Sequence, residues 1–230
     1  MAFSNDDLTS MKTFLEEKIT QKTEKTIVVE KPIGYDVENG IRSWDRVVDL
    51  AEVFTPSWLV EEMLNSIPEK VIVPEARTLE PSCGNGNFLV EIVARKLQSI
   101  KISNESNEMC FQIFKCLAST YGVDISESNV IEARSRLSDL VFGFLSKYKN
   151  ISTDIKFNSA INYVLKNNIL HADFLKNAES LEIIEFTFPK LFYVSQRIFT
   201  FLELLEINSE SFVFPRPTRI LPTIYYLDVK

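Results

Sequence analysis

The sequence predicts an α/β fold: a doubly wound, mostly parallel sheet with an antiparallel C-terminal finish and an N-terminal helical extension. Residues 78–90 pass from a short apolar approach through two glycines into a helical repeat. Residues 121–125 and 168–175 each contain a further short apolar stretch with an aspartate. Helix-like repeats separate these predicted strands, which favours parallel pairing in a sheet buried on both faces.

Composition sets the size and class of the protein. The chain has 230 residues, and its 45% apolar content is enough for one domain with a sizeable core. We expect residues 1–45 to form the helical extension and a linker, and residues 46–230 to form the domain. No apolar run is long enough to span a membrane and no signal peptide is visible, so we expect a cytoplasmic protein.

Net charge and cysteine content limit which partners and metal ions we expect this protein to bind. The net charge is −7, whereas a protein that binds duplex DNA by itself usually has a basic surface patch. Tight, autonomous DNA binding is therefore not expected. Cys83, Cys110 and Cys116 are an odd number without metal-ligand spacing, and His171 is the single histidine. We expect buried, reduced cysteines and no metal site.

The N-terminal part is predicted to be mostly helical. Residues 5–25 place apolar side chains on one helical stripe, which favours packing on the flank of the domain or, alternatively, a partner-binding arm. Residues 27–30 fit a short strand and residues 31–40 a linker. Thr55 and Pro56 then predict a helix start with Thr55 as N-cap. The apolar face of that helix is expected to comprise Trp58, Leu59, Met63 and Leu64.

The glycine segment is the strongest motif. Gly84 and Gly86 fall where the strand meets the helix, and residues without a Cβ let the backbone pass close under a ligand. Backbone N–H groups at the start of the helix face the same cleft. A plain strand-to-helix turn is the alternative. The buried face of the helix is predicted to comprise Phe88, Leu89, Ile92, Val93 and Leu97.

Further elements follow in order. Residues 109–117 form an apolar segment, and residues 121–125 a strand ending near Asp124. An acid at the end of the second strand accepts hydrogen bonds from ribose hydroxyls in nucleotide-binding folds, or it caps the next helix. Residues 126–148 and 155–166 predict helices, and His171 is expected to be a strand residue rather than a catalyst.

The segment Glu80-Pro81-Ser82-Cys83-Gly84-Asn85-Gly86-Asn87-Phe88 resembles the first motif of DNA adenine-N6 methyltransferases. Val53-Phe54-Thr55-Pro56 looks like the preceding motif of that family, and Asp173-Phe174 looks like its third motif. The resemblance implies a Rossmann-like class I methyltransferase fold and S-adenosyl-L-methionine as cofactor. The residues it implies for the cofactor are Phe54, Thr55, Pro56, Glu80, Pro81, Ser82, Gly84, Gly86, Phe88, Asp124, Ile125, Asp173 and Phe174.

The family's Asn-Pro-Pro-Tyr motif is missing. Residues 181–186 fit the strand that should precede it, and Thr187-Phe188-Pro189-Lys190 follows. The resemblance implies that Thr187 would accept a hydrogen bond from the target amine and that Phe188 would stack on the base. A plain turn is the alternative for these four residues.

The remaining chain is short. Residues 197–207 fit one helix, and residues 211–214 and 223–228 fit two strands around the turn 215–217. The resemblance covers roughly residues 51–175 and is nearest to short modification-methylase subunits of restriction systems.

Two functions are expected. The first is an S-adenosylmethionine-dependent methyltransferase acting on DNA, with a partner subunit for target recognition. The second is a catalytically degenerate, cofactor-binding subunit that regulates or scaffolds a restriction-modification or phage assembly. A nicotinamide-dependent dehydrogenase is disfavoured, because the third glycine of its fingerprint is missing and Pro81 lies inside the turn.

Overall fold

The computed structural model describes residues 54–68, 72–177, 180–201 and 215–230. The helix expected at residues 5–25, the strand at 27–30, the linker at 31–40 and the strand at 211–214 lie outside the described residues.

A three-stranded parallel sheet, in the order β1-β2-β3, forms the centre of the α/β fold. Its strands are β1 (Thr78–Glu80), β2 (Thr120–Asp124) and β3 (Ile169–His171). All five residues of β2 are buried, as the central strand of a parallel sheet requires. The parallel pairing predicted from the apolar stretches is therefore confirmed.

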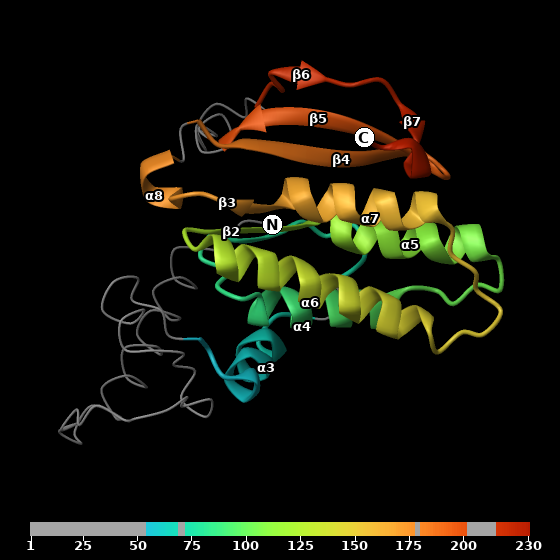
Figure 1. Ribbon diagram of the computed structural model, residues 1–230, viewed down its shortest axis with the longest axis horizontal. Helices are drawn as coiled ribbons and strands as arrows, with labels where there is room; N and C mark the ends of the chain where they lie inside the picture. Colours follow the sequence, from blue (N-terminus) through green and yellow to red (C-terminus); the bar gives the residue numbers. More distant parts are fainter. Residues whose placement is uncertain (1–53, 69–71, 178–179, 202–214) are drawn as a thin grey trace. The chain divides into compact units, whose positions relative to one another are not determined.

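Helices supply the crossovers that parallel strands need. Between β1 and β2 the chain forms α4 (Asn87–Ser99) and α5 (Ser106–Ala118). Between β2 and β3 it forms α6 (Glu127–Leu145) and α7 (Ile155–Asn168). Helix α4 packs against α6 and α5 against α7, and these two pairs form separate layers in Figure 1. All four helices contact β2.

The buried faces of the helices follow the predicted periodicity. In α4, Leu89, Val93 and Leu97 are at most 1% exposed. Helix α6 likewise buries Val130, Ala133, Leu137 and Val141. Lys96 lies on the same side of α4 and is fully buried, which the apolar pattern did not indicate. The three cysteines are free and buried within the main core, as expected.

The C-terminal part forms a separate antiparallel sheet. It contains β4 (Glu182–Lys190), β5 (Tyr193–Thr200), β6 (Arg219–Ile220) and β7 (Ile224–Tyr225). The C-terminal strands are antiparallel, as predicted, but they form a second sheet and do not continue the parallel one, so the prediction of a single mostly parallel sheet is wrong. In Figure 1 the β4–β5 hairpin lies beyond α7, on the side away from α6, and α7 contacts β4. The chain ends in a 3₁₀ turn, Tyr226–Asp228.

Three predictions for this region are wrong. Of the strand expected at residues 223–228, only Ile224–Tyr225 is a strand, and Tyr226–Asp228 is the 3₁₀ turn. Residues 197–200 belong to β5 rather than to a helix. The strand expected to end at residue 186 continues to Lys190, with a register irregularity between Thr187 and Lys190, so these residues do not form a turn.

Helix α3 (Ser57–Asn65) begins where expected, but its cap differs. Pro56 occupies the N-cap position and no side chain caps the helix, so the prediction of Thr55 as N-cap is wrong. The buried residues are Val60 and Leu64, whereas Trp58 is 55% exposed. The expected apolar face is therefore right at Leu64 and wrong at Trp58 and Met63, because Val60 and Leu64 are the residues that pack on Ile92 and Phe88 of α4.

Candidate functional site: the glycine loop at the carboxyl edge of the parallel sheet

The turn between β1 and α4 has a backbone that requires both glycines. Gly84 has φ 52° and Gly86 has φ 89°, a region that L side chains rarely adopt. A Cβ at Gly84 would lie 3.1 Å from the Phe54 ring, and one at Gly86 would lie 3.0 Å from the Cβ of Ala133. The glycines thus allow a tight turn and a close approach of the loop to α6.

The loop is anchored to the end of β2. The Cys83 N–H donates to the Val123 carbonyl at 2.9 Å, which continues the pairing of β1 with β2. The Gly84 N–H donates to Oδ2 of Asp124 at 2.8 Å. The segment that follows Glu80 is therefore held directly over the carboxyl end of the central strand.

Two side chains of α6 and a backbone carbonyl before α3 fix the loop. Arg136 of α6 donates through Nη1 to the Asn85 carbonyl at 2.8 Å and to Oδ1 of Asn87 at 2.7 Å. Asn85 donates through Nδ2 to Oε1 of Glu132 at 2.9 Å. Asn87 donates through Nδ2 to the Thr55 carbonyl at 2.8 Å, which joins the loop to the segment before α3. These hydrogen bonds were not predicted, because the sequence does not show which residues of α6 face the loop.

Acidic residues follow all three parallel strands at the same edge of the sheet. Glu80 ends β1 and Asp124 ends β2, while Asp173 comes two residues after β3. This edge is where ligands bind in open α/β sheets. The pKa of Glu80 is raised by burial, and a hydrogen bond from the Ser82 backbone opposes that rise. Glu80 is therefore a partly desolvated carboxyl group beside the loop.

Asp124 is largely engaged within the protein. It is 7% exposed, and Oδ1 accepts hydrogen bonds from the Ser126 N–H at 2.8 Å and from Nδ2 of Asn129 at 3.3 Å. Ser126, not Asp124, is the N-cap residue of α6, so the predicted alternative of Asp124 as helix cap is wrong. The Asp124 side chain instead links the loop, β2 and the start of α6.

Asp173 and Phe174 are also occupied. Oδ1 of Asp173 accepts from the N–H groups of Leu175 and Lys176, both at 3.1 Å, at the start of α8 (Phe174–Asn177). The hydrogen bonds from the backbone N–H and the side chain of Lys176 lower the pKa of Asp173. The Phe174 ring packs against Phe201, with centroids 4.8 Å apart.

The structure therefore brings together only part of the predicted cofactor set. Phe54 and Thr55 meet the loop at Gly84 and Asn87, and Glu80 and Asp124 flank it. Among the described residues, the buried Oδ1 of Asn85 has no hydrogen-bond partner. Pro81, Ser82 and Ile125 are exposed close by in the chain. The loop and its acids fit a ligand that carries hydrogen-bond donors.

Thr187 and Phe188 lie in β4, in the antiparallel sheet. The Thr187 hydroxyl donates to the Ser195 carbonyl at 3.3 Å across the hairpin. Phe188 packs edge-on against Phe111 and Phe114 of α5, with ring centroids 5.8 and 6.5 Å apart. Both side chains thus have structural contacts in the hairpin and the core.

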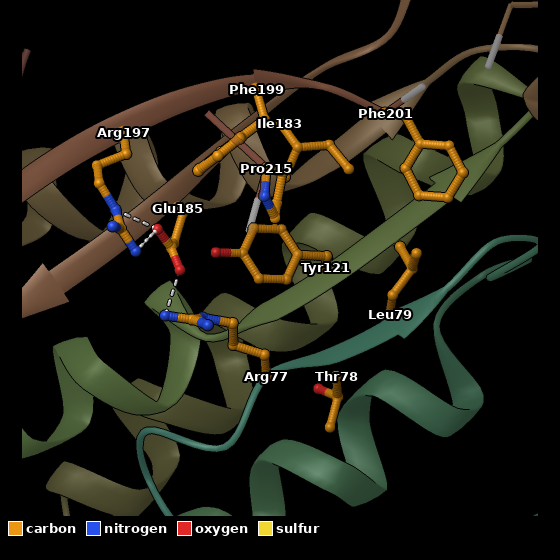
Figure 2. Close-up of a pocket in the computed structure, with 10 residues that line it drawn as sticks. All are labelled: Arg77, Thr78, Leu79, Tyr121, Ile183, Glu185, Arg197, Phe199, Phe201 and Pro215. Carbon is orange, nitrogen blue, oxygen red and sulfur yellow. Dashed lines mark hydrogen bonds and ion pairs between the residues drawn. The ribbon is translucent and has the colours of Figure 1, made fainter. Parts of the chain in front are cut away.

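A pocket of about 560 Å³ lies elsewhere, between β1, β2 and the β4–β5 hairpin (Figure 2). None of the predicted cofactor residues lines it. The sequence offered a weak signal for it, because Glu185 and Arg197 each lie next to apolar residues within a strand. Its lining residues are Arg77, Thr78, Leu79, Tyr121, Ile183, Glu185, Arg197, Phe199, Phe201 and Pro215.

Comparison of the chain with protein-family models, curated proteins and solved structures found no match. Over the part of the chain that the structure describes, no three histidine, cysteine or acidic side chains gather closely enough to hold a metal ion. Among the same residues, no helix has the length and apolar character needed to cross a membrane.

Proposed function

We propose that this chain binds S-adenosyl-L-methionine at the glycine loop and belongs functionally with methyltransferases that modify adenine in DNA. The observation that carries the proposal is the turn between β1 and α4, where Gly84 and Gly86 both have positive φ beside Glu80 and Asp124. The resemblance of residues 80–88 to the first motif of the adenine-N6 group supplies the identity of the ligand.

Different residues of the chain would make different contacts with the cofactor. Glu80 would accept hydrogen bonds from the cofactor, and its burial strengthens such bonds. The Phe54–Thr55 segment, fixed to Asn87, would close the loop from the α3 side. Asp124 would keep Gly84 in place and contribute its remaining acceptor capacity to the ribose. Bound there, S-adenosyl-L-methionine supplies an electrophilic methyl group, and the protein contributes by positioning the acceptor.

Isothermal titration tests the cofactor site. We expect wild-type protein to bind S-adenosyl-L-methionine with a micromolar dissociation constant, and Glu80→Gln to weaken binding about tenfold, because it removes a charge-assisted acceptor without changing shape. Glu62→Gln, on the exposed face of α3, is the matched control and should bind as wild type. Absence of wild-type binding would mean that the glycine loop is only a turn.

A second candidate function is a cofactor-binding subunit without catalysis. The contacts of Thr187 with Ser195 and of Phe188 with α5 favour it, because both side chains are engaged in the fold. The acidic net charge of −7 also fits a subunit that relies on partners for contact with DNA. Such a chain would regulate or scaffold a restriction-modification or phage assembly.

Methyl transfer from labelled S-adenosyl-L-methionine to adenine-containing DNA separates the two candidates. An enzyme that holds its target amine with Thr187 should lose at least about tenfold in rate in Thr187→Val, because an essential hydrogen bond to the target is removed. Thr218→Val is the matched control, since the Thr218 hydroxyl also donates to a β5 carbonyl, that of Ile198 at 2.9 Å. Equal rates in both variants would remove Thr187 from catalysis. Cofactor binding without any methyl transfer would favour the second candidate.

A further inference from the structure

The pocket between the parallel sheet and the β4–β5 hairpin has two chemically different ends. Figure 2 shows Arg77, Glu185 and Arg197 together on one side, and Leu79 and Phe201 on the other, with Tyr121 between them. Its volume of about 560 Å³ is that of a small-molecule site. Ligand sites commonly combine such an apolar lining with a few polar groups that fix orientation.

Among the described residues that line the pocket, the charged end has two cationic side chains and one anionic side chain. Glu185, whose side chain is 10% exposed, pairs through Oε1 with Arg77 and through Oε2 with Arg197. One carboxylate between two guanidinium groups leaves a net charge of about +1. Each guanidinium has five N–H donors, and the Arg77 side chain, 59% exposed, uses Nη2 on Glu185. Arg77 therefore has donors available for an anion at the pocket.

The apolar end is aromatic and preformed. Tyr121 and Phe201 line it with rings, and Ile183 and Leu79 complete it. The Phe199 ring lies toward the charged end, 5.8 Å from Cζ of Arg197. The Tyr121 hydroxyl lies 3.1 Å from the Ala118 carbonyl and 3.0 Å from the Ile184 carbonyl, which fixes its ring against the pocket. Phe174 backs Phe201. Flat apolar molecules stack well on such rings.

We propose that this pocket binds a flat, apolar small molecule that carries one anionic group, with the ring system against Tyr121 and Phe201 and the anion at Arg77. The site is independent of the glycine loop, because no residue proposed for S-adenosyl-L-methionine lines it. A second ligand site of this kind would give the chain a binding activity separate from the cofactor.

The matched probes are 1-naphthaleneacetate and its neutral amide, 1-naphthaleneacetamide, titrated into the full chain by saturation-transfer NMR. We expect the acid to bind with a dissociation constant on the order of 0.1–1 mM and the amide about tenfold more weakly, since a charge-assisted bond to arginine is lost. Arg77→Gln should bring the acid to the affinity of the amide and leave the amide unchanged. Arg77→Lys, which keeps the charge, should preserve most of the preference.

Arg95→Gln is the control for removal of an arginine. Arg95 lies on α4 and pairs with Glu91 at 2.7 Å, outside the pocket. Its replacement should change neither affinity, and thermal unfolding should show that each variant is folded. Equal binding of acid and amide by wild type, no binding of either, or displacement of the acid by S-adenosyl-L-methionine would overturn the proposal. A result in which the protein fails to bind S-adenosyl-L-methionine but still prefers the acid to the amide would support this pocket and contradict only the proposed cofactor site.

Discussion

Gly86→Ala should lower the free energy of unfolding by about 2–4 kcal/mol, one of the largest effects that a single added methyl group can have in this chain. Gly86 has φ 89°, where a Cβ is strained whatever the surrounding space. That Cβ would also lie 3.0 Å from the Cβ and 3.3 Å from the Cα of Ala133, and this backbone atom cannot swing away. Urea unfolding followed by circular dichroism measures the loss.

Gly143→Ala is the matched control, because it adds the same methyl group at a glycine within helix α6. A Cβ at Gly143 would meet nothing within 4 Å, so this variant should gain about 0.5–1 kcal/mol from better helix propensity. Adding Ala133→Gly to Gly86→Ala should relieve only the contact with the Ala133 Cβ, because the Cα of residue 133 and the φ of residue 86 are unchanged. A glycine within α6 itself costs about 1 kcal/mol, which offsets part of this gain. Equal stability of Gly86→Ala and Gly143→Ala would contradict the geometry of the loop.

The elements that could be predicted from the sequence are those with local signals. The glycine loop and α4 follow from Gly84, Gly86 and the spacing of Leu89, Val93 and Leu97, which no distant contact needs to reinforce. The strands β2 and β3 follow from short apolar runs between helices. The arrangement of acids at one edge then follows from parallel topology.

The hairpin was not predicted, because its turn at Leu191 and Phe192 has no glycine, asparagine or aspartate to mark it, and because the packing of β4 on α5 is a distant contact. Pro189 favours a turn locally, yet β4 runs through it because residues 182–187 pair with β5 and Phe188 packs on α5. Residues 197–201 contain only three apolar side chains, Ile198, Phe199 and Phe201, which are too few to separate helix from strand by periodicity. The pocket depends on the same pairing, so Arg77, Glu185 and Arg197 come together only in the folded chain.

The burial of Lys96 was also not predicted from sequence periodicity. This buried amine gives the second large predicted effect, a change in stability with pH. Its side chain is fully buried, and Nζ lies 2.6 Å from the Ala76 carbonyl, 2.8 Å from Oγ of Ser119 and 2.9 Å from Oγ1 of Thr120. Burial lowers the pKa of Lys96 from 10.5 to about 8, and a weaker electrostatic interaction with Cys116 opposes this. The ammonium form therefore costs free energy in the folded state.

The sign of the resulting pH dependence follows from proton binding. Between pH 8 and 10.5 the unfolded chain binds more protons at Lys96 than the folded chain, so the Lys96 contribution to the free energy of unfolding rises with pH. The rise approaches about 1.4 kcal/mol per pH unit, or about 3 kcal/mol over the whole interval. Below pH 8 both states are protonated and the contribution is constant and unfavourable.

Lys96→Met isolates this effect, because methionine fills a similar volume and does not titrate. Burial raises the pKa values of Cys83 and Cys116 to about 12, which lowers the stability of both proteins above pH 9. That loss largely cancels when the variant is subtracted from wild type at each pH. We expect the difference in unfolding free energy, wild type minus Lys96→Met, to be flat from pH 6 to 7.5 and to rise between pH 8 and 9.5, measured by urea unfolding. A difference that stays flat to pH 9.5 would show that the carbonyl and hydroxyl acceptors around Nζ stabilise the charged amine as well as water does.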